Sequence, residues 1–139
     1  MLRWLFDQSL LVQYALLLPP LGIGGVLTWA VFGRRARLTR RAERAAQRAL
    51  AAARAEGLAV RHCSVFGAVD VNAGSLAIVF HVADDATLVA AEASGAEVRL
   101  REHTLEALRQ VNYPATPSSI SLVSDETVDR EGGPAVYFR

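Results

Sequence analysis

The chain has 139 residues, enough for one domain, and 52% of them are hydrophobic. Its single cysteine, Cys63, excludes a disulfide within the chain and fits the reducing cytosol. The basic residues other than histidine are all arginine, a composition that we interpret as typical of a GC-rich bacterial genome.

The net charge of +1 conceals two parts of opposite sign. Over residues 1–61, ten arginines oppose three acidic residues, a net charge of +7. Over residues 62–139, five arginines oppose eleven acidic residues, a net charge of −6. Because an acidic domain repels phosphate backbones, we expect no nucleic acid among its partners.

Residues 9–32 contain no charged side chain and are rich in Leu, Val, Ile, Ala and aromatic residues. As a helix this stretch would extend about 36 Å, which is enough to cross a hydrocarbon core of about 30 Å. Tyr14 and Trp29 lie toward its two ends, where amphipathic rings favour the headgroup level. The sequence therefore predicts an N-terminal membrane anchor, residues 1–33, with a single transmembrane helix.

Two alternatives for this segment stay open. Arg3 precedes the apolar stretch as in a cleaved signal peptide, although the stretch exceeds the usual h-region of about 7–15 residues. Pro19 and Pro20 fall in its middle, where proline removes helix hydrogen bonds. They predict either a kinked spanning helix or a re-entrant hairpin with both ends on the cytoplasmic side.

The orientation follows from arginines that crowd the C-terminal flank of this stretch. They are Arg34, Arg35, Arg37, Arg40, Arg41, Arg44 and Arg48. The N-terminal flank has Arg3 opposed by Asp7, so the positive-inside tendency places the C-terminal domain in the cytoplasm, at the inner membrane. We expect the flanking arginines to contact anionic lipid of the inner leaflet, each worth about 1 kcal/mol near the surface.

Residues 34–57 predict a juxtamembrane helix, because strong helix formers run up to a C-cap glycine, Gly57. Beside the arginines lies a stripe of small apolar residues, namely Leu38, Ala42, Ala45, Ala49 and Ala52. Two interpretations fit this pattern: a solvated linker helix, or a helix whose stripe pairs with another helix in a dimer or partner complex.

Residues 58–139 predict an acidic α+β domain with the element order ββααββ. Residues 58–71 and 75–83 are typical of a β-hairpin, with turn residues between them. Asp84 offers a helix N-cap, and two helices are expected over 86–93 and 96–111. Short strands at 120–123 and 134–139 would complete an antiparallel sheet covered by helices on one face.

Catalytic and metal-binding motifs are weak in this domain. His62 and Cys63 are adjacent and would point to opposite faces of a strand. A metal site using His62, His81, His103 and Cys63 requires the fold to bring them together, since none shows ligand-pair spacing. No Ser–His–Asp combination has local support, and the pattern indicates neither a metal nor a cofactor.

The most distinctive polar segment, residues 124–133, carries four acidic residues: Asp125, Glu126, Asp129 and Glu131. Their spacing does not fit a calcium-binding EF-hand. The segment is either a solvated loop or helical turn capped by Ser124, or an acidic recognition loop for a basic partner; an active-site carboxylate pair is a further alternative.

Together these patterns predict a membrane-anchored, non-enzymatic binding module that presents an acidic cytoplasmic domain to a protein partner or an identical subunit. An immunity-type or accessory protein is one version. The alternatives are a structural subunit of a membrane assembly, packed through Gly22, Gly24 and Gly25, and a small tethered enzyme that uses a carboxylate or histidine.

Overall fold

The computed structural model describes residues 33–34 and 36–138, and Arg37–Arg139 form one compact unit. The predicted transmembrane helix over residues 9–32, with its two prolines, lies outside the described residues. Among the described residues, no helix is long and apolar enough to cross a membrane.

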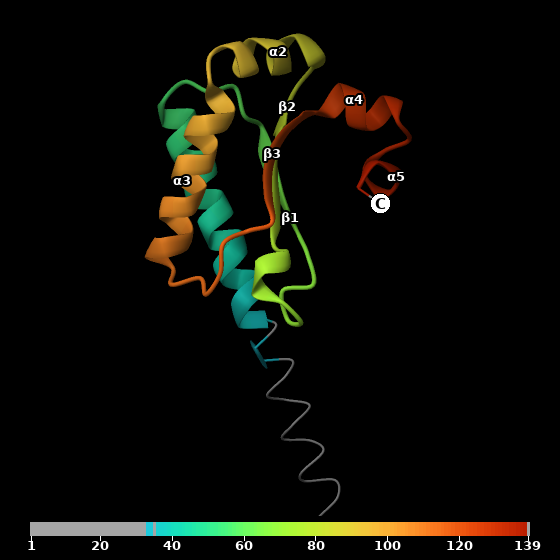
Figure 1. Ribbon diagram of the computed structural model, residues 1–139. Helices are drawn as coiled ribbons and strands as arrows, with labels where there is room; N and C mark the ends of the chain where they lie inside the picture. The colour runs from blue at the N-terminus through green and yellow to red at the C-terminus, as the bar shows by residue number, and fades with distance from the viewer. Residues whose placement is uncertain (1–32, 35, 139) are drawn as a thin grey trace, which may run out of the picture. The chain divides into compact units, whose positions relative to one another are not determined.

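The described part of the chain contains one three-stranded sheet, in the order β1-β2-β3 (Figure 1). Strand β1 (His62–Phe66) pairs with β2 (Ala77–Val82) in antiparallel fashion, and β2 pairs with β3 (Ser119–Ser124) in parallel fashion. The short 3-10 helix η1 (Ala73–Ser75) lies in the connection between β1 and β2. The domain is therefore mixed α/β, and its β1–β2 pair confirms the predicted hairpin.

The prediction of a wholly antiparallel sheet is wrong. Helices α2 (Asp85–Ala93) and α3 (Ala96–Gln110) separate β2 from β3, and such a long crossover lets the chain return parallel to β2. The segment predicted as the last strand forms helix α5 (Pro134–Tyr137), preceded by α4 (Asp125–Arg130). Proline in the first turn of α5 favours a helix start, because its missing N–H needs no partner there.

The two central helices have nearly the predicted bounds. The Asp84 side chain accepts a hydrogen bond from the Thr87 backbone N–H at 2.7 Å, which caps α2. Gly95, with φ 71°, separates α2 from α3, and the left-handed conformation there suits glycine.

Residues 36–55 are helical and belong to the core of the domain. The side chains of Ala42, Ala45, Ala49 and others on this helix are buried with Ile78 and Phe80 of β2. Alanine lets the helix approach the sheet closely. The interpretation as a solvated linker is therefore wrong for this stretch, of which residues 37–55 fall within the compact unit Arg37–Arg139.

The main core lies on one face of the sheet, and a smaller apolar cluster lies on the other. Figure 1 shows helix 36–55 and α3 on one side of the sheet, and α4 and α5 on the other. On this second side a small apolar cluster joins Val79, Val123 and Val128 to Tyr137 and Phe138. We call this side the open face.

Candidate functional site

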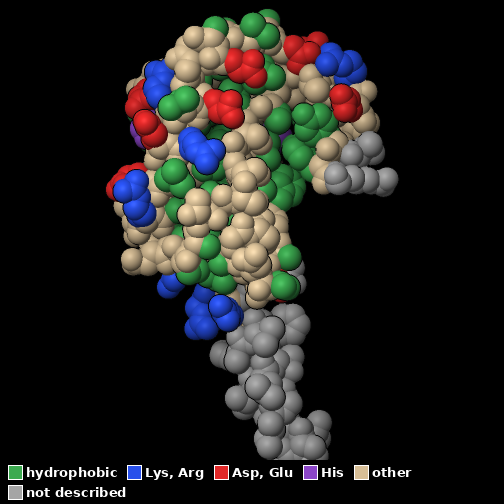
Figure 2. Space-filling view, viewed as in Figure 1, with side chains coloured by type: hydrophobic (Ala, Val, Ile, Leu, Met, Phe, Trp, Pro, Cys, Tyr) green, Lys and Arg blue, Asp and Glu red, His purple; other side chains and the backbone are tan. Residues whose placement is uncertain are grey.

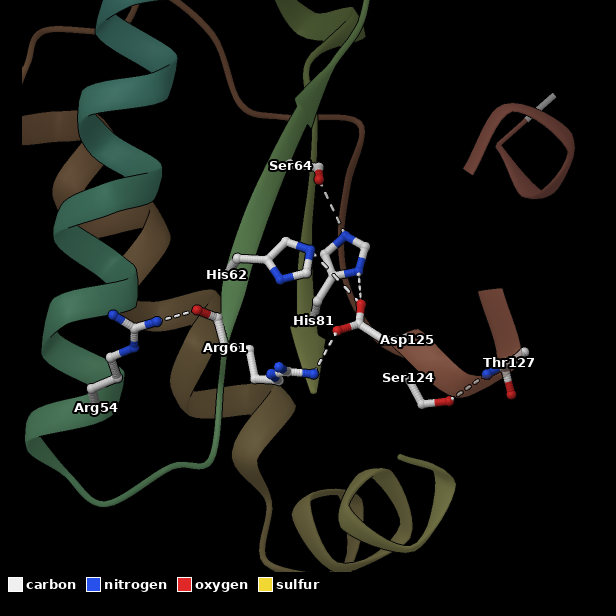
Figure 3. Close-up of polar contacts among 8 residues, drawn as sticks. All are labelled: Arg54, Arg61, His62, Ser64, His81, Ser124, Asp125 and Thr127. Atoms are coloured by element: carbon white, nitrogen blue, oxygen red, sulfur yellow. Dashed lines mark hydrogen bonds and ion pairs between the residues drawn. The ribbon is translucent and has the colours of Figure 1, made fainter. Parts of the chain in front are cut away.

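Three polar side chains from separate elements meet on the open face (Figure 3). The antiparallel register places His62 of β1 directly opposite His81 of β2. The parallel register places Val123 beside His81, so Asp125, the first residue of α4, follows at the end of β3. One nitrogen from each ring and one oxygen of the carboxylate lie within 4.8 Å of one another.

His81 lies between two hydrogen-bonding partners. Its Nδ1 is 3.0 Å from Asp125 Oδ1, and its Nε2 is 3.2 Å from Ser64 Oγ. The residue is 3% exposed, and burial lowers the pKa of the imidazole, followed by the charge of His62, while Asp125 opposes the shift. In the favoured neutral form Nδ1–H donates to Asp125, and Nε2 accepts from the Ser64 hydroxyl.

His62 and Arg61 complete the cluster from β1 and the residue before it. The His62 ring stacks on His81, with centroids 4.1 Å apart and an interplanar angle of 14°. Its Nε2 lies 3.8 Å from Asp125 Oδ1, and its side chain is 53% exposed. Arg61 Nη1 lies 3.5 Å from the other carboxylate oxygen, Oδ2.

Helix α4 is held in place by α2, and this fixes Asp125. The Asp85 carboxylate accepts hydrogen bonds from Ser124 Oγ, from Thr127 Oγ1 at 2.6 Å and from Arg130 Nη1 at 3.0 Å. The Ser124 and Thr127 bonds, with Arg130 adding to them, lower the pKa of Asp85 to about 2. Ser124 Oγ also accepts from the Thr127 backbone N–H at 3.0 Å, so Ser124 caps α4 as the sequence indicated.

The four acidic residues predicted for partner recognition have different positions. Asp125 belongs to the histidine cluster, and Glu126 Oε2 accepts from the Asp85 backbone N–H at 3.1 Å. Asp129 and Glu131 are exposed. Two of the four are therefore engaged within the domain, although Glu126 is exposed, as Asp129 and Glu131 are.

An apolar hollow of about 520 Å³ lies beside the cluster on the open face. Phe66, Val79, Val123, Tyr137 and Phe138 are among its lining residues, and Figure 2 shows hydrophobic side chains in the recess beside the C-terminal helices. The Phe138 ring contacts Phe66 at a centroid distance of 4.9 Å and His81 edge-on at 6.1 Å. Phe138 thus joins the hollow to the polar cluster.

Of the four metal-ligand candidates in the sequence, the fold brings His62 and His81 together. His103 Nε2 lies 2.8 Å from Glu56 Oε1 on another part of the surface. Cys63 packs against the main core on the other side of the sheet, and burial raises the pKa of its thiol. Sequence reasoning missed Ser64 and the partnership of Asp125 with the histidines; period-2 alternation along β1 does place His62 and Ser64 on one face.

The chain matches no protein-family model, no curated protein and no solved structure.

Proposed function

We propose that the domain is a membrane-tethered binding module whose open face receives an apolar segment of a protein partner. The observation that carries this proposal is the apolar hollow, with Phe66 38% exposed at its margin. An accessible concave surface lined by aromatic side chains gains free energy when a partner covers it, because apolar area leaves water.

The neighbouring strand edge favours an extended partner segment. In the described sheet, β3 pairs with β2 on one side and forms an edge on the other. Ser121 and Val123 of β3 line the hollow. A partner strand added at this edge would form main-chain hydrogen bonds and place alternate side chains in the hollow. Exposed Asp129 and Glu131 favour basic residues beside the apolar ones.

The membrane tether and the cytoplasmic location stay part of this proposal. They are supported by the uncharged stretch of residues 9–32 and by arginines that follow it. Among the described ones, Arg34, Arg37, Arg40, Arg41, Arg44 and Arg48 are all exposed. Exposed guanidinium groups can contact anionic headgroups of the inner leaflet, although Arg41 also donates to the Asn112 backbone carbonyl at 3.2 Å.

The test uses a photo-crosslinking amino acid at position 66 of the full chain in its native membrane, with position 98 as the control. Val98 is an exposed apolar residue on α3, away from the hollow. We expect position 66, and not position 98, to crosslink one protein through a segment with apolar residues.

A synthetic peptide of the crosslinked segment should then bind the wild-type chain and the Val98→Ser variant, and lose binding to the Phe66→Ser variant. Equal binding to both variants, or adducts at position 66 with lipid alone, would contradict the proposal. Changing Asp129 and Glu131 to alanine should weaken binding of a segment that carries basic residues.

A second candidate function is a small tethered hydrolase. It is favoured by the two hydrogen bonds that connect Ser64 to His81 and His81 to Asp125. Their distances of 3.2 Å and 3.0 Å match those of a nucleophile, a general base and an orienting carboxylate. A fluorophosphonate probe separates the two functions: labelling of Ser64 that is lost in Asp125→Asn supports a hydrolase, and an unlabelled wild-type chain argues against it.

A further inference from the structure

We propose that His62, His81 and Asp125 bind a divalent transition-metal ion of the zinc type. Two imidazole nitrogens and one carboxylate oxygen form a ligand set that such ions accept readily. This inference is independent of the partner that the hollow receives.

The ligand atoms already have nearly the spacing that an ion requires. Metal–ligand distances of about 2.1 Å in tetrahedral geometry separate ligand atoms by about 3.4 Å. The measured separations are 3.0 Å between His81 Nδ1 and Asp125 Oδ1, and 3.8 Å between His62 Nε2 and the same oxygen. These two values lie on either side of the ideal, and all three ligand atoms, the two ring nitrogens included, lie within 4.8 Å of one another.

His62 has the freedom to complete the site. In the stacked arrangement the two rings are nearly parallel, so their in-plane lone pairs do not converge on one point. The ion therefore requires His62 to tilt out of the stack, while His81 stays fixed. The His62 side chain is 53% exposed, and its position opposite His81 keeps the two rings close while it turns.

The surrounding side chains supply suitable supporting contacts. When Nδ1 of His81 binds the ion, its proton must reside on Nε2, and Ser64 Oγ at 3.2 Å is the acceptor for that N–H. The Ser64 hydroxyl thereby changes from donor to acceptor. Arg61 holds Oδ2 of Asp125 at 3.5 Å, which leaves Oδ1 for the ion. Three protein ligands leave a coordination position open for water or another donor.

The experiment is a titration of the full, chelator-stripped chain in mild detergent with zinc chloride by calorimetry, and with cobalt chloride by visible absorption. Wild type and His103→Ala should each bind one equivalent; His103 is the matched control because it pairs with Glu56 outside the cluster. His62→Ala and Asp125→Asn should each bind zinc at least about tenfold more weakly, and Ser64→Ala about tenfold more weakly.

His62→Ala is the decisive variant, because an exposed side chain contributes little to the core and the variant should fold, as circular dichroism will verify. A second readout is the ¹⁵N shift of His81: with zinc, Nδ1 should lose its proton and Nε2 should carry one. The proposal is overturned if the wild type binds no zinc at micromolar concentrations, or if folded His62→Ala binds it as tightly as the wild type does.

Discussion

His81 Nδ1 lies 3.0 Å from Asp125 Oδ1, and this contact joins the middle strand of the sheet to the first turn of α4. The residue before Asp125, Ser124, is itself bonded to Asp85 of α2. Ser124 also pairs with Val82 of β2. The Asp125 carboxylate therefore follows a residue that both the sheet and α2 hold in place. Its orientation toward the histidines is a property of the folded domain.

The burial of His81 predicts that the metal-free domain loses stability in mild acid. The pKa of His81 in the folded state is lowered from 6.5, so the unfolded chain binds the proton more readily. Stability is thus retained above about pH 6.5 and declines as the pH falls through that value toward the folded pKa. Asp125 opposes the shift, and His62 adds to it.

Urea unfolding of the full chain at pH 7.5 and pH 5.5, with a chelator present, measures this effect. The midpoint should fall at pH 5.5 in wild type and in the His103→Ala control. It should fall less in His81→Gln, which lacks the titrating ring. An identical decline in His81→Gln would show that other groups cause the acid sensitivity.

Asp85 is predicted to determine how firmly α4 is held. Its carboxylate accepts bonds from Ser124, Thr127 and Arg130, and the pKa of about 2 reflects how strongly they favour the ionised form. The stability that this group provides is present above pH 3.8 and is lost as the pH falls toward 2. Asp85→Asn should therefore release α4 even at neutral pH.

Hydrogen exchange of the amides of α4 is the direct measurement. They should exchange faster in Asp85→Asn than in wild type. Asp129→Asn, an exposed change on the same helix, should leave their exchange unaltered. Equal exchange in the two variants would mean that the Asp85 bonds do not hold the helix.

The core position of helix 36–55 predicts a sharp difference between two alanines. Ala45 is fully buried, whereas Ala51 on the same helix is exposed. Ala45→Leu should destabilise the domain by about 1–3 kcal/mol, because the added volume has to push helix and sheet apart. Ala51→Leu should change stability by no more than about 0.5 kcal/mol. Chemical unfolding of both variants measures the difference. Equal changes in the free energy of unfolding would mean that this helix is a solvated linker after all.

Local signals were sufficient to predict α2 and α3 from the sequence. Asp84 marks the start of α2, Gly95 separates the two helices, and the proline at position 114 follows the end of α3. The role of helix 36–55 was missed, since a stripe of alanines carries a weak hydrophobic signal. At the C-terminus, two apolar residues in alternation, Val136 and Phe138, were too short a pattern to distinguish a strand from a helix.

The site was harder to predict than the helices. His81 and Asp125 are 44 positions apart, and their contact depends on the parallel register of β2 and β3. No local pattern encodes that register, because it is set by how the crossover through α2 and α3 packs. The four acidic residues looked alike in the sequence, yet the fold places Asp125 beside His81, His62 and Arg61.

The contact between Phe66 and Phe138 predicts how α5 is attached to the open face. Their rings are 4.9 Å apart, and aromatic pairs of this kind contribute about 0.5–1.5 kcal/mol beyond the area they bury. Phe66→Ala should therefore speed hydrogen exchange of the amides of residues 135–138 while leaving α3 protected, because the small cluster beneath α5 is separate from the main core. Val98→Ala on α3 is the control, since it removes an exposed apolar side chain of the main body. Unchanged exchange in Phe66→Ala would mean that α5 is held by other contacts. In wild type, a peptide bound in the hollow should slow exchange over the same residues, because the partner would cover the surface that Phe66 and Phe138 share.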